Sequence, residues 1–202
     1  MHQNKMSMSE NRKNYSHEAW TNALSSLFED EYPEHRFRIP VHEIDALEGL
    51  PPDKWPTAGQ PKINWDLSVQ GREFTMDLPC SLVLQPADCA DADIGAMVLG
   101  KVKFSDFDPL LHPHFCMTDS DLWDGLDPFK LGRAVLHIAK GWPVSPVHLC
   151  VHEDGGFFFG GGTHRYEVLK RTGTSYMYFL AKPVDVINIE TRLSVQWLSH
   201  CV

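Results

Sequence analysis

The sequence lacks the features that would assign it to a membrane, secreted or zinc-ribbon class of protein. No run approaches the roughly 18 consecutive apolar residues that a membrane-spanning helix needs, and the opening MHQNKMSMSENRKN has no apolar segment of a secretory signal. The five cysteines are an odd set without a Cys-x-x-Cys pair, which argues against a disulfide framework or a zinc ribbon. We therefore expect a cytoplasmic protein with reduced cysteines and no membrane insertion.

Positive charge is also scarce. The chain has 202 residues and a formal net charge of −9, whereas a protein that captures nucleic acid through its phosphates needs a basic face. The charge is uneven along the chain: segment 86–127 has nine aspartates and two lysines, and segment 157–202 has five basic residues and three acids. A polyanion is therefore expected to approach the C-terminal part.

The composition is that of a globular protein, with 43% hydrophobic and 22% charged residues. One main core is expected at this length. We predict a flexible arm over 1–17, an N-terminal extension with an accessory sheet over 18–95, and the core over 96–202. The prolines between 33 and 61 favour extended loops that wrap the surface and do not join the core.

The predicted core alternates strands and helices. The helix over 127–140 has the clearest signals, because Asp127 can cap it, Pro128 suits its first turn and apolar residues recur every three to four positions. The other expected elements are a strand over 96–104, strands over 147–151 and 156–159 joined by a turn, a helix over 165–173, and a last strand followed by a tail.

The junction between the second predicted hairpin strand and the next helix is GGGTHR, residues 160–165. Glycines let an anion approach the main chain, and a helix N-terminus offers unpaired N–H groups and the positive end of the helix dipole. Thr163, His164 and Arg165 could add a hydroxyl, a proton carrier and a planar cation. The pattern favours a phosphate site, although a glycine-rich turn with solvated side chains would have the same sequence.

Segment 127–173, with its Asp-Pro-x-Lys helix start, proline-led strand, hairpin and Gly-Gly-x-His-Arg loop, resembles the core of the ParB/sulfiredoxin superfamily. The resemblance implies an α+β fold with a compact mixed sheet, flanking helices and an N-terminal extension. In sulfiredoxin-like members the loop holds ATP phosphates, and the helix contributes its lysine and the residues three and seven positions later. The matching residues here are Lys130, Arg133 and His137, which a 3.6-residue period places on one side of the helix.

The chain departs from the superfamily pattern at two points, and these departures exclude two of the functions that the resemblance would imply. Sulfiredoxins have a cysteine where this chain has Thr163, so sulfinic-acid reduction is not expected. Only about 30 residues follow Gly173, too few for the helix-turn-helix of ParB. The chain is most similar in layout to plasmid fertility-inhibition (oncogenic suppression) members, which implies ATP hydrolysis, DNA nuclease activity and inhibition of conjugation or type IV secretion of DNA.

The cofactors that this resemblance implies are ATP and Mg²⁺, and its partners are a nucleotide, DNA and a type IV secretion component. The nucleotide-binding residues it predicts are Lys130, Arg133, His137, Gly160, Gly161, Gly162, Thr163, His164 and Arg165. The predicted catalytic residues are Arg133, His164, Arg165 and Glu167. For Mg²⁺, the candidate acids are Asp106, Asp108, Glu153, Asp154 and Glu167.

Two alternatives remain. His112, His114 and Cys116 could point the same way from an extended segment and bind a metal, with Asp119 and Asp121 nearby. The spacing matches no common zinc pattern, however, and a polar surface insertion is the simpler explanation. The other alternative is a non-catalytic inhibitor that uses the acidic segment 86–127 to occupy a basic partner.

Overall fold

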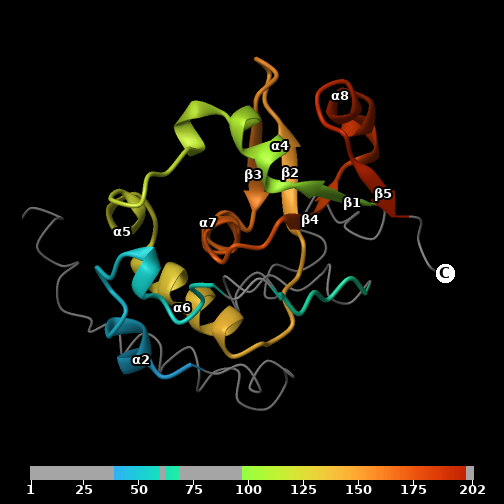
Figure 1. The fold of residues 1–202 in the computed structure, drawn as a ribbon. Coiled ribbons are helices and arrows are strands. Elements are labelled where there is room, and N and C mark those ends of the chain that lie inside the picture. Colours follow the sequence, from blue (N-terminus) through green and yellow to red (C-terminus); the bar gives the residue numbers. More distant parts are fainter. Residues whose placement is uncertain (1–38, 60–61, 69–96, 199–202) are drawn as a thin grey trace, which may run out of the picture.

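A five-stranded mixed sheet flanked by helices forms the centre of the protein (Figure 1). The computed structural model describes residues 39–59, 62–68 and 97–198. The strand order is β3-β2-β4-β1-β5; β2 and β4 pair in parallel and the other neighbours are antiparallel. The strands are β1 Val98–Lys103, β2 Val147–Val151, β3 Phe157–Gly161, β4 Tyr176–Ala181 and β5 Gln196–Leu198. The α+β class is confirmed.

Part of the predicted organisation lies outside the described residues. This applies to the arm over 1–17 and to the accessory sheet expected in the second half of the extension, since residues 69–96 are not described. Within the described ranges, no helix is long and apolar enough to cross a membrane.

Helix α6, Pro128–Ala139, confirms the helix predicted over 127–140. The Asp127 carboxylate accepts a hydrogen bond from the Lys130 amide at 3.0 Å, which satisfies one of the N–H groups that a helix start leaves unpaired. Leu131, Ala134, Val135 and Ile138 are buried, so the apolar stripe seen in the sequence is the face that packs on the core.

The hairpin of β2 and β3 is also confirmed, with its turn at 152–156. The His152 amide donates to the Gly156 carbonyl at 2.7 Å and the Gly155 amide to the His152 carbonyl at 2.8 Å. Helix α7, Thr163–Arg171, follows β3 and begins two residues before the predicted helix. In Figure 1 the hairpin turn lies at the far end of β2 and β3 from α7.

The prediction that β4 is the last strand and is followed only by a tail was wrong. The chain after β4 contains a 3-10 turn, η8 Pro183–Asp185, the helix α8 Val186–Glu190 and strand β5, which pairs with β1. Ile189 and Leu193 are buried in the core, and Trp197 lies edge-on to Phe179 with ring centroids 5.6 Å apart. Tertiary packing stabilises these short elements, which have too little local periodicity to be predicted.

The prediction that the proline-rich segment stays out of the core was wrong for residues 39–59. This segment forms α2, Val41–Asp45, and η3, Pro52–Lys54. Leu47 and Trp55 belong to the main hydrophobic cluster. The indole N–H groups of Trp55 and Trp123 both donate to the Leu50 carbonyl, at 2.9 and 2.8 Å. Prolines prevent a long helix here, but they do not prevent aromatic anchors from entering the core.

Short elements between β1 and α6 complete the fold. An aromatic group formed by Phe107, Phe157, Phe159 and Tyr166 joins this segment to the hairpin and to α7, with ring centroids 4.5 to 5.7 Å apart. The elements are α4 Phe104–Phe107, η6 Asp108–Leu110, η7 Pro113–Phe115 and α5 Leu122–Gly125.

Candidate functional site

The glycine segment turns the chain from β3 into α7. Gly162 occupies the N-cap position with a φ of 92°, a left-handed conformation that favours glycine. Its carbonyl accepts the first intrahelical hydrogen bond, from the Tyr166 amide at 2.9 Å. Because glycine has no side chain, the cap position does not cover the N–H groups of the first turn. A positive helix end therefore lies directly after a strand, as the sequence predicted.

The three glycines differ in what surrounds them. A Cβ atom on Gly162 would lie 2.9 Å from Arg165 Nη2 and 3.0 Å from Val147 Cγ1, so this position is closed. On Gly160 it would lie 2.7 Å from His148 Nδ1. On Gly161 it would meet only His148 Cβ, at 3.9 Å. The main chain is thus open to an approaching group at Gly161, one residue before the helix cap.

Arg165 has a different environment from the one predicted. Its side chain is buried, with 2% of the residue exposed. Nη1 donates to the Ser145 carbonyl at 2.7 Å, to the Pro146 carbonyl at 3.1 Å and to the Ser145 hydroxyl. The guanidinium therefore fastens the start of α7 to the segment that connects α6 to β2, and this group of contacts is structural.

Glu167, a predicted catalytic and Mg²⁺-binding residue, is completely buried. Its carboxylate pairs with Arg171 one helical turn later, and Arg171 also donates to Asp119 at 2.6 Å. Burial raises the pKa of the Glu167 carboxyl, although the hydrogen bond from Arg171 acts in the opposite direction. The structure therefore places this acid in a buried ion pair with no solvent-facing oxygen.

The predicted residues on α6 have separate environments. His137 is buried, and its Nε2–H donates to the Pro143 carbonyl at 2.8 Å, since a carbonyl can only accept. Lys130 and Arg133 are half-buried. His137 and Arg165 both contact the connecting segment 143–146, and α6 contacts α7. The connecting segment 143–146 therefore contacts both the C-terminal half of α6 and the start of α7.

Two aspartates of the acidic segment bind α7. Asp108 accepts from the Tyr166 hydroxyl at 2.5 Å and from Lys170 at 2.6 Å, and Asp119 pairs with Arg171. Burial raises the pKa of Asp108, but the hydrogen bonds from Lys170 and Tyr166 outweigh it and leave the pKa below its usual value. Part of the acidity of this segment therefore serves to hold the basic C-terminal turn of α7.

The extended arrangement of His112, His114 and Cys116 that was considered as an alternative metal site is not formed. Pro113 begins the 3-10 turn η7, and the rings of His112 and His114 stack with centroids 5.0 Å apart. Cys116 instead directs its sulfur toward the carbonyls of Leu111 and His112, each at 3.7 Å. The alternation needed to align the three side chains is lost because the segment is a turn and not a strand.

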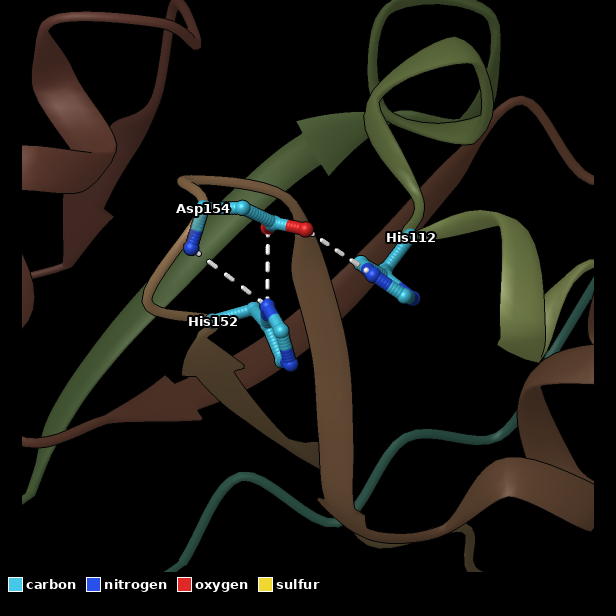
Figure 2. Close-up of side chains that lie close together, drawn as sticks. All are labelled: His112, His152 and Asp154. Carbon is cyan, nitrogen blue, oxygen red and sulfur yellow. Dashed lines mark hydrogen bonds and ion pairs between the residues drawn. The ribbon is translucent and has the colours of Figure 1, made fainter.

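His112 instead meets two residues of the β2–β3 turn, His152 and Asp154, as Figure 2 shows. Sequence reasoning named Asp154 as a possible Mg²⁺ ligand near the glycine segment and did not single out His152. The turn lies at the opposite end of the hairpin from that segment, and the five residues of β3 at about 3.3 Å each separate the two by roughly 16 Å. Neither Glu153 nor Asp154 is therefore near the glycine segment.

The described residues define an α+β protein with a mixed sheet and a main chain that is open at Gly161, one residue before the N-cap of α7. A scan against protein-family models and searches of curated proteins and of solved structures found no match to this chain. Membership of the ParB/sulfiredoxin superfamily therefore stays a prediction from the sequence motif.

Proposed function

We propose that the protein binds the phosphates of a nucleotide, ATP with Mg²⁺, at the glycine segment 160–163 and the N-terminus of α7. The observation that supports this most directly is the open main chain at Gly161, beside a nine-residue helix whose cap residue has no side chain. A phosphate at this position would interact with main-chain N–H groups and with the positive end of the helix dipole.

The surrounding side chains have distinct proposed roles. Thr163 and His164 are the half-buried residues of the first turn. In this proposal the Thr163 hydroxyl donates to a phosphate oxygen, and the His164 imidazole, whose Nε2 is buried, lies in the same turn. Lys130 and Arg133 supply positive charge from the neighbouring helix α6. Arg165 keeps the segment in shape through Ser145 and Pro146, and so supports the site without a direct phosphate contact.

The proposed reaction is hydrolysis of the nucleotide, with DNA cleavage and inhibition of conjugation or type IV secretion as its biological use. In this proposal, His164 and Arg133 stabilise the charge that develops on the transferred phosphoryl group or the cleaved phosphodiester. These activities rest on the sequence resemblance, whereas phosphate binding rests on both the resemblance and the geometry.

The alternative of a non-catalytic acidic inhibitor has weaker support. Asp108 and Asp119 are already paired with α7, so reversing Asp119 would disturb the fold as well as the surface. A test of that alternative should reverse only Asp121 and Asp124, which are exposed and have no ion pair within the described residues.

Gly161 allows a matched test of the proposal. Both Gly161→Ala and Gly161→Asp should fold, because the added Cβ has space and the residue does not need a positive φ. The aspartate would place a negative charge where the phosphate is proposed to lie. We expect it to weaken binding of Mg·ATP by about tenfold or more, equivalent to about 1.4 kcal/mol, and the alanine, which adds only a methyl group to this space, to weaken binding less.

The measurement is titration calorimetry with Mg·ATP, with hydrolysis followed by phosphate release and far-UV circular dichroism as the test of folding. Lys130→Ala should weaken binding in the same assay, and Lys54→Ala, at an exposed lysine of η3, is the control for loss of positive charge. Equal affinity of the Gly161→Asp and Gly161→Ala proteins, or no binding by the parent protein, would refute the proposal.

A further inference from the structure

Three potential metal ligands meet at the end of the β2–β3 hairpin, far from the glycine segment. His112 Nε2 lies 3.0 Å from one oxygen of the Asp154 carboxylate, and His152 Nδ1 lies 2.8 Å from the other. The three ligand atoms all lie within 4.8 Å of one another. Figure 2 shows the two imidazoles on either side of the carboxylate, brought together from segments 40 residues apart in the chain.

Main-chain pairing fixes the position of each contributing segment. The His112 amide donates to the Phe157 carbonyl at 2.8 Å, and Leu111 forms a parallel bridge with Phe157 at the start of β3. On the other side, the Gly156 amide donates to the Asp154 carboxylate at 3.0 Å. The ligands are therefore held by backbone contacts that do not depend on a bound ion, which is the preorganisation that a metal site requires.

Close packing adds to this positioning. A Cβ atom on Gly156 would lie 3.1 Å from His112 Cβ, so the turn and the His112 segment are already in contact. The His112 ring contacts those of both His114 and His152, with centroid distances of 5.0 and 4.3 Å. His152 also lies edge-on to Phe158 at 6.1 Å. Both imidazoles thus have a restricted range of orientations.

The ligand types indicate the class of ion. Two imidazole nitrogens and one carboxylate suit divalent first-row metals such as Zn²⁺, Fe²⁺, Co²⁺ or Mn²⁺, whereas Mg²⁺ and Ca²⁺ prefer oxygen ligands alone. Three protein ligands leave at least one coordination position for water or substrate. Water can reach this coordination position, because the side chains of Asp154 and His152 are 55% and 35% exposed. The side chain of His112 is 11% exposed and forms the inner side of the site.

Binding one ion needs some rearrangement, because the two imidazoles now face different oxygens of the Asp154 carboxylate. Two ligand atoms bound tetrahedrally at about 2.0 to 2.1 Å from Zn²⁺ lie roughly 3.3 to 3.4 Å apart, slightly more than the 3.0 and 2.8 Å that separate the imidazole nitrogens from the carboxylate. At His112, whose Nδ1 accepts from the His114 amide, binding would replace the Nε2 proton that faces Asp154, whereas His152 Nδ1 already accepts from the Asp154 amide at 3.4 Å. His112 would then carry its proton on Nδ1 and lose the weak contact from the His114 amide at 3.3 Å.

From this arrangement we infer that His112, His152 and Asp154 form a binding site for a divalent first-row transition metal, with His114 and Cys116 outside the coordination shell. The site is independent of the proposed nucleotide site at the other end of the hairpin. A bound ion would join the segment before η7 to the β2–β3 turn and would present an open coordination position to solvent.

The test uses the full chain without a polyhistidine tag, titrated with ZnCl₂ in the presence of a competing chelator. The primary variants are Asp154→Asn and His152→Ala, which alter the two more exposed ligands and are expected to preserve the fold. We expect each to weaken Zn²⁺ binding by about 10-fold or more, since even residues that only support ligands contribute about 10- to 100-fold to metal affinity. MgCl₂ should not compete at equal concentration.

The matched controls are His114→Ala and Cys116→Ser, which remove neighbouring potential ligands. Both should retain the affinity of the parent protein, and a Co²⁺ complex should lack the absorption of a thiolate-to-cobalt charge transfer. Circular dichroism of each variant separates loss of the site from loss of the fold. The inference is overturned if the parent protein binds no Zn²⁺ in this titration, if both primary variants bind Zn²⁺ as tightly as the parent, or if Cys116→Ser alone abolishes binding.

Discussion

Replacing Arg165 with alanine tests whether this residue maintains the structure or contacts the nucleotide. The side chain is 2% exposed, and Nη1 is the donor to three acceptors, namely two main-chain carbonyls and the Ser145 hydroxyl. Ser145 and Pro146 are themselves buried, so the substitution would leave these oxygens without their donor in a site with little access to water.

The magnitude follows from those contacts. Each buried acceptor that loses its partner costs about 1 to 3 kcal/mol, and removing one member of a buried charged network typically costs about 3 to 5 kcal/mol in total. We expect Arg165→Ala to lower the free energy of unfolding by this amount, a large part of the 5 to 15 kcal/mol that is roughly typical of a domain. Arg165→Lys keeps the charge but not the planar guanidinium group, and it should lower the free energy of unfolding by about half as much as Arg165→Ala.

Urea unfolding, followed by tryptophan fluorescence and by far-UV circular dichroism, measures the change. Coincident transitions with an unchanged dependence on urea would indicate a two-state loss of stability. Arg192→Ala is the control, because Arg192 is exposed and donates only to the Gly155 carbonyl within the described residues. It should change stability by less than about 1 kcal/mol.

The result that would refute this reasoning is an Arg165→Ala protein with the stability of the parent. If that protein had also lost Mg·ATP binding, Arg165 would be a phosphate contact, as the sequence resemblance first indicated. If both properties were unchanged, the guanidinium would contribute neither to the fold nor to the proposed site.

Two further predictions concern the packing around α7 and the N-terminal segment. Asp108→Asn should lower stability at pH 7 by about 1 kcal/mol, since the pair with Lys170 is partly exposed. Because the folded pKa of Asp108 is depressed, this difference should be present above about pH 4 and disappear as the pH falls through the folded pKa; a difference that persists unchanged at pH 2 would contradict it. Trp55→Ala should lower the free energy of unfolding, measured with urea, by about 3 to 5 kcal/mol, because Trp55 is 2% exposed in the core. A change below about 1 kcal/mol would show that residues 39–59 contribute little to the core.

The elements with strong local signals could be predicted. Helix α6 has a cap, a first-turn proline and an apolar stripe within one short segment, and the β2–β3 hairpin has two β-favouring runs around a polar turn. The glycine segment was placed correctly at a strand-to-helix junction for the same reason, since three consecutive glycines interrupt both patterns.

The environments of single side chains could not be predicted in this way. Arg165 and Glu167 have the same sequence signature whether they face a ligand or the core, and only their burial against Ser145 and Arg171 separates the two cases. Trp55 lies in the core although its segment is rich in proline, because Trp123 of α5, which is distant in the chain, packs edge-on against it with ring centroids 6.1 Å apart.

The sequence by itself determined where helix, hairpin and glycine turn occur, because these depend on backbone preferences and on periodicity within a few residues. The tertiary structure alone decided which charges are buried, which glycine is open and which histidine meets Asp154. Such contacts join segments that are far apart in the chain, and their free energies depend on burial and geometry that exist only once the sheet and helices have packed.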